Sequence, residues 1–238
     1  GTNPCSEIIL RSREFCNLSE CVIRRDDTRE HLKEKVRVAT ILGTFQSTLT
    51  EFKYLSREWK RNCEEERLLG VSLTGIMDNP LTNGSKKGLD KLLEELRDVA
   101  YETNKEWAEK LGIPPSAAIT CVKPSGTVSQ LVDSASGIHA RHNPFYIRTV
   151  RADNKDPLCN LMKEMGFPNE PDVTKPDHTT VFSFPMKSPK DAVFRMDMSA
   201  LEQLELWKTY ATSWCEHKPS VTISVKEDER VDVAAWVY

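Results

Sequence analysis

Residues 89–122 read LDKLLEELRDVAYETNKEWAEKLGIPPSAAITCV, and this stretch predicts a long helix followed by a short strand. Apolar side chains recur at helical spacing over Leu89–Leu111, and the sequence Gly112-Ile113-Pro114 ends the helix. The run Ala117–Val122 is apolar and β-prone, so we expect a buried strand there. A helix that leads into a buried strand is a building unit of α/β folds.

The same alternation of helices and strands continues outward in both directions. The sequence Asp27-Thr28-Arg29-Glu30 resembles a capping box, which marks the start of a helix. Further strands are expected at Leu69–Thr74, Tyr146–Val150, Thr180–Phe184 and Val221–Val225, and further helices at about Thr28–Phe52, Pro157–Met165 and Ser199–Cys215. This order predicts an α/β fold with largely parallel strand pairing.

The composition is that of a globular protein and limits the classes of function. The chain has 238 residues, which suits one large domain or two small ones. Its 33 basic and 36 acidic residues give a net charge of −3, which argues against direct nucleic-acid binding, because such proteins are usually basic. No apolar run is long enough to form a membrane-spanning helix.

The seven cysteines are irregularly spaced and include no Cys-x-x-Cys pair. This pattern argues against a secreted disulfide scaffold and a structural zinc site, and it favours a reducing cytoplasm. We expect Cys21 and Cys63 to be buried or incidental, and Cys121 and Cys159 to pack in the core.

The sequence Asn3-Pro4-Cys5-Ser6-Glu7 places an amide, a thiol and a carboxyl at alternate positions. In an extended segment these three side chains project to the same side, and Pro4 favours that conformation at Asn3. The pattern therefore groups a hydrogen-bonding group, a redox-capable sulfur and a proton acceptor. An ordinary loop with a buried cysteine is the alternative for these five residues alone.

A second candidate site is Pro124-Ser125-Gly126-Thr127-Val128-Ser129, directly after the predicted strand. Small residues let backbone N–H groups approach an anion, and the hydroxyls add donors. A common turn is the alternative, and the Gly-Lys-Ser/Thr ending of a Walker loop is missing. Arg141, Arg148 or Arg151 could add positive charge nearby, whereas His139 and His142 lack companions with metal-ligand spacing.

Taken together, these motifs resemble the catalytic subunit of ribonucleotide reductase. The resemblance rests on Asn-Pro-Cys-x-Glu at residues 3–7, FCNLSE at 15–20, RLLGVSLTG at 67–75, KPSGTVS at 123–129 and CEHKPS at 215–220. These segments span nearly the whole chain. The ten residues between Cys5 and Cys16 resemble the adenosylcobalamin-dependent branch, class II.

The resemblance implies a role for each motif residue. Cys5 becomes a thiyl radical that abstracts the 3′ hydrogen of a ribonucleotide, Glu7 takes the proton of the 3′ hydroxyl, and Asn3 hydrogen-bonds the ribose or the radical intermediate. Cys16 is one member of the cysteine pair that supplies two electrons, and its partner lies upstream of this chain. Residues 3–7 form the substrate-binding finger loop, and residues 124–129 hold the substrate phosphates.

The resemblance also implies the architecture and the partners. The chain, residues 1–238, would be the C-terminal portion of a ten-stranded α/β barrel with the finger loop at its centre. Both ends look cut, so we expect part of a larger or split enzyme that is inactive without the N-terminal half. The expected cofactor is adenosylcobalamin, the expected substrate a ribonucleotide, with a triphosphate favoured, and the expected reductant a thioredoxin-type protein.

Other functions remain as alternatives. A reductase of the iron- or manganese-radical class is disfavoured by the short spacing between Cys5 and Cys16. The formate-using class lacks the reductive cysteine pair that Cys16 would serve. A nucleotide-binding or assembly module without catalysis would use only the phosphate loop.

Overall fold

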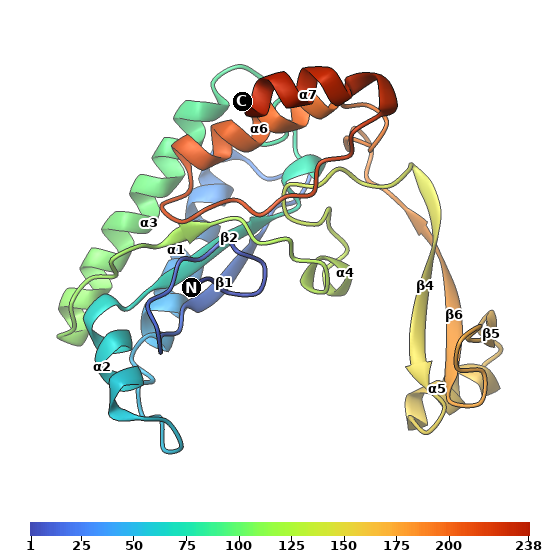
Figure 1. Ribbon diagram of the computed structural model, residues 1–238, viewed down its shortest axis with the longest axis horizontal. Helices are drawn as coiled ribbons and strands as arrows, with labels where there is room; N and C mark the ends of the chain where they lie inside the picture. Colours follow the sequence, from blue (N-terminus) through green and yellow to red (C-terminus); the bar gives the residue numbers. More distant parts are fainter. The chain divides into compact units, whose positions relative to one another are not determined.

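The computed structural model describes residues 1–238, which form two compact units (Figure 1). The first unit comprises Gly1–Arg141 together with Asp191–Tyr238, and the second comprises His142–Lys190. Helices and strands alternate along the chain, so the predicted α/β class is confirmed.

The first unit is built on a parallel sheet of three strands in the order β1-β2-β3. β1 (Asn17–Val22) pairs along its whole length with β2 (Leu69–Thr74), and β2 pairs with β3 (Thr120–Cys121). The strand predicted at 69–74 is confirmed with the same bounds. β3 is shorter than the predicted strand at Ala117–Val122, although Ile119 and Val122 are buried as expected.

Two long helices pack on one face of this sheet. α1 (Arg29–Gln46) and α3 (Leu89–Leu111) contact each other, and α1 also contacts β1 and β2 (Figure 1). Their buried leucines join Val71 and Leu73 in the main hydrophobic core. Burying these apolar faces is the chief stabilising contribution to the unit, because each fully buried leucine or valine side chain contributes about 1.5–3 kcal/mol.

The capping box of α1 lies one residue later than expected. Thr28 is the N-cap, its hydroxyl accepts the His31 backbone N–H, and the His31 ring accepts the Thr28 N–H. The carboxylate of Asp27 instead accepts the Arg24 backbone N–H at 2.7 Å and pairs with Lys35 at 2.5 Å. Asp27 therefore fixes the turn before the helix and does not cap it.

The two helices end differently. α3 ends where predicted, because Gly112 adopts a left-handed conformation with φ +66°. α1 ends at Gln46, earlier than the predicted Phe52, because the hydroxyls of Ser47 and Thr48 donate to carbonyls of its last turn.

The remaining helices of the first unit lie around this framework. α6 (Ala200–Ser213) contacts α3 and begins at the capping box of Ser199 and Glu202, which confirms the helix predicted there. The others are α2 (Arg57–Glu66), η1 (Ile76–Asp78), α4 (Val128–Leu131), η2 (Glu227–Glu229) and α7 (Arg230–Val237). The sequence analysis did not predict β1 or α7.

The strand expected at Val221–Val225 is wrong. The segment before it runs beside β3, where Val122 and Pro219 form one parallel bridge and the Ser220 N–H donates to the Val122 carbonyl at 2.8 Å. No strand continues beyond Val122 into Lys123-Pro124, so residues 221–225 have no strand edge with which to form hydrogen bonds.

The two faces of the parallel sheet differ in chemistry. Leu69 and Ser19 point toward α1: a Cβ atom at Gly43 of that helix would lie 3.4 Å from Leu69 and 3.5 Å from the Ser19 hydroxyl. On the opposite face the Ser72 hydroxyl donates to the Glu20 carboxylate at 3.3 Å. Side chains alternate between the faces of a strand, so one face of the sheet joins the hydrophobic core and the other carries polar side chains.

The second unit is an antiparallel sheet with one helix. β4 (Phe145–Asp153) pairs with β6 (Thr179–Lys187), and β5 (Asn169–Pro171) pairs with the other edge of β6. α5 (Pro157–Glu164) is capped by Asp156. The strands predicted at Tyr146–Val150 and Thr180–Phe184 and the helix predicted at Pro157–Met165 are confirmed. The strands pair antiparallel here, not parallel as expected, because the connection between β4 and β6 stays within the unit and reverses the chain direction.

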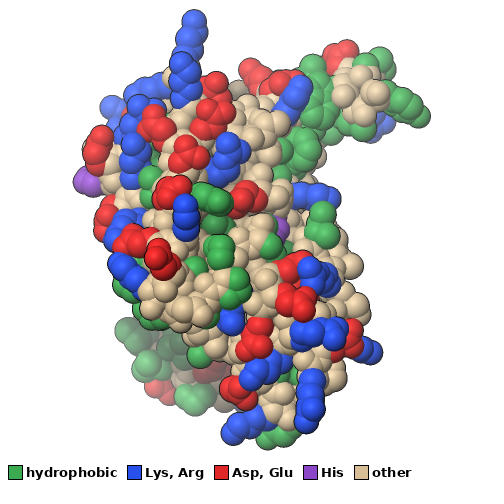
Figure 2. Space-filling model, turned by 90° about the vertical axis from the view of Figure 1, so that its left-hand side faces the viewer, with side chains coloured by type: hydrophobic (Ala, Val, Ile, Leu, Met, Phe, Trp, Pro, Cys, Tyr) green, Lys and Arg blue, Asp and Glu red, His purple; other side chains and the backbone are tan.

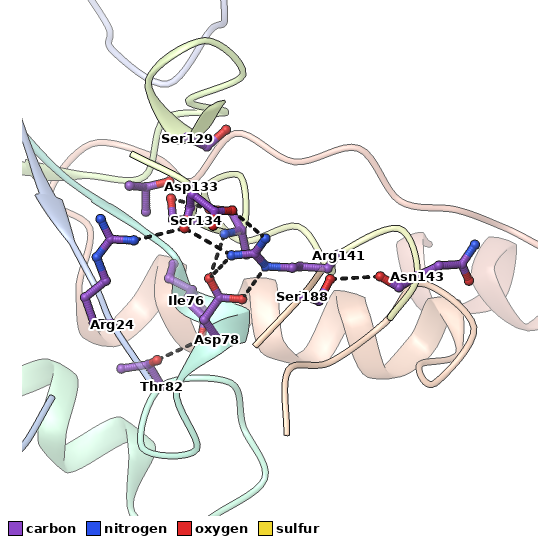
Figure 3. Close-up of polar contacts among 12 residues, drawn as sticks. Arg24, Ile76, Asp78, Thr82, Ser129, Asp133, Ser134, Arg141, Asn143 and Ser188 are labelled. Carbon is purple, nitrogen blue, oxygen red and sulfur yellow. Dashed lines mark hydrogen bonds and ion pairs between the residues drawn. The ribbon is translucent and has the colours of Figure 1, made fainter. Parts of the chain in front are cut away.

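A buried ion pair connects η1, which follows β2, to the segment after α4 (Figure 3). The Arg141 guanidinium donates to both carboxylate oxygens of Asp78 at 2.7 and 2.9 Å, and each side chain is only 3% exposed. Arg141 also donates to Asp133 at 3.1 Å. We expected Arg141 to add charge near the phosphate loop, but its charge is neutralised by these carboxylates. Arg148 and Arg151 lie on β4 of the second unit.

The surface carries both signs of charge. Figure 2 shows basic and acidic side chains interspersed over the face that it presents. Ion pairs such as Lys33 with Glu95 and Arg37 with Glu106 link α1 to α3. None of the helices combines the length and the apolar character needed to cross a lipid bilayer.

Substituting Asp78→Asn should destabilise the first unit by about 3 kcal/mol, because it leaves the buried Arg141 charge without its main partner. The free energy of unfolding in urea, followed by tryptophan fluorescence, measures this, since all five tryptophans lie in that unit. The matched control is Asp133→Asn, whose side chain is 62% exposed and which should cost about 1 kcal/mol or less. Equal costs for the two variants would contradict the expectation.

Candidate active site

Residues 1–10 form a short hairpin rather than an extended strand. Gly1 and Leu10 exchange hydrogen bonds at 2.9 and 3.0 Å, and Thr2 bridges Ile9. At the tip, the Ser6 N–H donates to the Asn3 carbonyl at 3.0 Å, and Ser6 has a φ of 60°. The expected extended conformation is therefore wrong: a tight turn is closed by its own backbone hydrogen bonds.

The turn nevertheless brings two of the three motif side chains together. The Asn3 amide donates to Oε1 of Glu7 at 2.6 Å and accepts the Ile8 N–H at 3.0 Å. Cys5 lies at the tip with its side chain exposed. Pro4 and Ser6 are exposed beside it. The hairpin thus presents an accessible thiol next to an ordered amide and carboxylate.

Glu7 is completely buried and is held from three sides. Besides Asn3, the ammonium group of Lys123 lies 2.6 Å from Oε1, and the Lys218 N–H donates to the Glu7 carbonyl at 3.0 Å. The other carboxylate oxygen, Oε2, has no partner. Burial lowers the pKa of Lys123, but the hydrogen bond and charge of Glu7 outweigh this effect and raise it. Lys123 therefore stays charged.

Lys123 directly precedes the candidate phosphate loop, so this ion pair joins the loop to the hairpin. Within the loop, Gly126, Thr127 and Val128 are exposed, whereas Ser125 and Ser129 are buried. The backbone N–H groups of the three exposed residues donate to no acceptor in the chain. Pro124 is half-buried at the start of the loop. Donors for an anion are thus available at residues 126–128.

Glu20 on β1 lies against the same loop, and the sequence analysis missed it. Its carboxylate accepts the hydroxyls of Ser125 and Ser72. Burial raises its pKa, and the two hydroxyls and the charge of Lys123 partly offset this. The Ser125 hydroxyl is therefore occupied by Glu20 and not free for an anion. The acidic side chain of Glu20 within the strand-forming segment 17–22 was the sequence signal that could have identified it as a site residue.

Cys16 lies on the polar side of the sheet, half-buried. A Cβ atom at Gly70 would lie 3.3 Å from the Cys16 sulfur and 3.4 Å from the Cys121 sulfur. Burial raises the pKa of the Cys16 thiol to about 12; Lys123 opposes the shift, and Glu7 and Glu14 add to it. The thiol is thus protonated at neutral pH, and glycine at position 70 leaves it room.

The other cysteines and histidines have structural surroundings. Cys21, Cys63, Cys121, Cys159 and Cys215 are buried, and all seven cysteines are free. The ring of His139 contacts the Ser136 carbonyl at 2.8 Å through Nδ1 and accepts the Thr222 N–H at 2.9 Å through Nε2. The structure contains no group of three or more His, Cys, Asp or Glu side chains that could hold a metal ion.

The chain is similar in sequence to known reductases. The chain is 29% identical to an adenosylcobalamin-dependent ribonucleoside-triphosphate reductase of Lactobacillus acidophilus, over 98% of the chain and 35% of that protein. A protein of the same name from Euglena gracilis is 30% identical over 94% of the chain and 30% of its own length. The chain resembles a segment of the class II ribonucleotide reductases. The resemblance found from the motifs is therefore confirmed.

A solved structure extends the agreement to the fold. A crystal structure of a B12-dependent (class II) ribonucleotide reductase matches the chain with a TM-score of 0.84 and 25% identity, over the whole chain and 36% of the reductase. The α/β fold is therefore that of a part of this reductase. The chain spans about a third of the length of the curated relatives that it matches. No family model matches the chain.

Alkylation should separate the two candidate redox cysteines. At about pH 8, iodoacetamide should modify the exposed Cys5 much faster than Cys16, because the thiolate is the reactive form and little of the Cys16 thiol is ionised. Modification of Cys16 should accelerate as the pH rises toward 12. Peptide mass spectrometry measures both rates, with Cys5→Ser as the control that removes the fast reaction. Equal rates at Cys5 and Cys16 would contradict this assignment.

Proposed function

We propose that residues 1–238 form the C-terminal part of the catalytic barrel of an adenosylcobalamin-dependent ribonucleoside-triphosphate reductase. In this proposal residues 3–7 are the finger loop and residues 124–129 the phosphate loop. The observation that carries it is the ion pair between Glu7 and Lys123, which fixes the turn that bears Cys5 beside the loop with free N–H donors. The N-terminal half of the barrel is then a required partner, on the same or another chain.

The first step falls to Cys5. Adenosylcobalamin, when bound, supplies the initial radical. The Cys5 thiol suits such a group, because it is exposed at the tip of the turn and can be reached from outside this part of the fold. As a thiyl radical, Cys5 takes the 3′ hydrogen atom of the ribose, so an S–H bond forms as the C–H bond breaks. It returns a hydrogen atom at the end of the cycle.

Glu7 and Asn3 act on the ribose hydroxyls. Glu7 takes the proton of the 3′ hydroxyl, which makes loss of the 2′ hydroxyl as water easier. Asn3 already uses its carbonyl and one amide hydrogen within the turn, so one N–H remains for the substrate. The buried setting of Glu7 supports this role, because it keeps competing water away from the proton acceptor.

Cys16 supplies electrons together with a cysteine of the N-terminal half. The two thiols give up two hydrogen atoms and become a disulfide: one hydrogen ends on the 2′ carbon, and the other leaves in water. A thioredoxin-type dithiol then reduces the disulfide. The seven free thiols are compatible with a reducing cytoplasm as the location of the protein.

The substrate phosphates bind at residues 126–128 in this proposal. The free N–H groups of Gly126, Thr127 and Val128 and the hydroxyl of Thr127 are the donors for them. The small side chains allow the three phosphates of a nucleoside triphosphate to approach the backbone.

Replacing Cys5→Ser should abolish ribonucleotide reduction in an assembly reconstituted with the N-terminal half, because a hydroxyl cannot carry the radical. Nucleotide binding, measured by equilibrium dialysis, should persist, because the phosphate donors are unchanged. Reduction by the variant would refute the radical assignment. Binding without any reduction by the unaltered assembly would instead favour a non-catalytic nucleotide-binding module.

Cys16→Ser should have a different effect. Hydrogen abstraction by Cys5 should persist, because its residues are intact, whereas turnover with a dithiol should stop. Electron paramagnetic resonance of the frozen reaction detects the radical, and product analysis measures turnover. Normal multiple turnover by the variant would show that Cys16 is not an electron donor.

A further inference from the structure

The two oxygens of the Glu7 carboxylate have different surroundings. Oε1 accepts the Asn3 amide and the Lys123 ammonium, each at 2.6 Å, whereas Oε2 has no partner. The residue is 0% exposed, so solvent does not reach it. A buried acceptor without a partner is unfavourable, and a ligand hydroxyl that reached Oε2 would relieve this cost.

Lys123 is the only cation paired with this carboxylate. An ionised carboxylate without a counter-charge in a buried position is strongly disfavoured and takes up a proton instead. The amide of Asn3 offers a hydrogen bond but no charge. The only positive charge paired with the Glu7 carboxylate is therefore that of Lys123.

The backbone of Lys123 is itself held in place. Its N–H donates to the Ser72 hydroxyl at 2.9 Å, so β2 fixes the position of the Lys123 backbone. Gly137, with a φ of +54°, packs directly on its carbonyl, where any side chain would overlap it. Pro124 follows and restricts the chain at the start of the phosphate loop. The ammonium group thus reaches Glu7 from a rigid base.

We propose that Lys123 is a positioning residue of the reductase: it keeps Glu7 ionised and anchors Oε1, so that Oε2 is the atom that takes the 3′-hydroxyl proton. In that step the O–H bond of the sugar breaks, an O–H bond to Oε2 forms, and the electron pair stays on the 3′ oxygen. This inference rests on the proposed function and adds to it a residue that touches neither the sugar nor the thiol.

No other group near Glu7 can take over this role. The titratable groups that face it besides Lys123 are Cys16 just before β1, Cys121 on β3 and His217 on the C-terminal segment. Cys5, on the hairpin, lies near the Lys123 ammonium group. Cysteines carry no positive charge, and burial lowers the pKa of His217, which keeps its ring neutral at physiological pH.

The pH dependence of kcat in the complete reductase tests the proposal. Lys123→Met should lower kcat at neutral pH by about tenfold or more and move the acidic limb of the profile upward by about one pH unit or more, because Glu7 then ionises less readily. Lys123→Arg should restore most of the activity, because it keeps the charge. Lys123→Gln serves as a second uncharged variant should Lys123→Met not fold. Lys91→Met, on the exposed side of α3, is the matched control.

Three results would overturn the proposal. A uniform loss of kcat at all pH values would indicate a structural role only. A rise in KM for the nucleotide with an unchanged pH profile would make Lys123 a phosphate ligand instead. An unaltered profile in both uncharged variants would exclude any role in ionising Glu7.

A parallel Glu7→Gln variant separates this inference from the proposed function. If Glu7→Gln still reduces ribonucleotides at the normal rate, the base assigned in the proposed function is wrong. If Glu7→Gln is inactive while Lys123→Met keeps the wild-type profile, only the role of Lys123 fails.

Discussion

The candidate site depends on one contact between an ammonium group and a buried carboxylate. Lys123 and Glu7 are 116 positions apart in sequence, yet their charged atoms lie 2.6 Å apart. The pair connects the N-terminal hairpin to the end of β3 and to the loop that follows it. Separating these charges would leave the buried Glu7 carboxylate without a counter-charge. The hairpin is also fixed through its backbone by Lys218, so the C-terminal segment holds it from the other side.

The helix α3 and the strand β2 were predictable from sequence, whereas β1, which carries Glu20, was not. The bounds of α3 and β2 follow from strong periodicity and a glycine stop, and the structure reproduces them. β1 escaped prediction because Glu20 and Ser19 interrupt its apolar character, and Glu20 is there to contact the phosphate loop. A strand with one face toward a site lacks the pattern of a strand buried on both faces.

The site residues were named from their motif, but their geometry required the fold. A turn, not an extended strand, brings Asn3 to Glu7, and the local sequence did not predict that turn. The contacts of Lys123 with Glu7 and of Ser125 with Glu20 join distant segments, which no local pattern can specify. Lys123 had one available signal: it is the only charged residue in the stretch 117–129.

The second unit, residues 142–190, is inserted in the sequence of the first, and hydrogen bonds join its first residues to its last ones. The Ser188 N–H donates to the Pro144 carbonyl at 2.9 Å, and its hydroxyl donates to the Asn143 carbonyl at 2.8 Å. The chain therefore departs and comes back at almost one place. An appendage attached in this way can grow, shrink or be exchanged for a short linker while the parallel sheet keeps its register, which makes residues 142–190 a natural position for variation or for a genetically inserted tag.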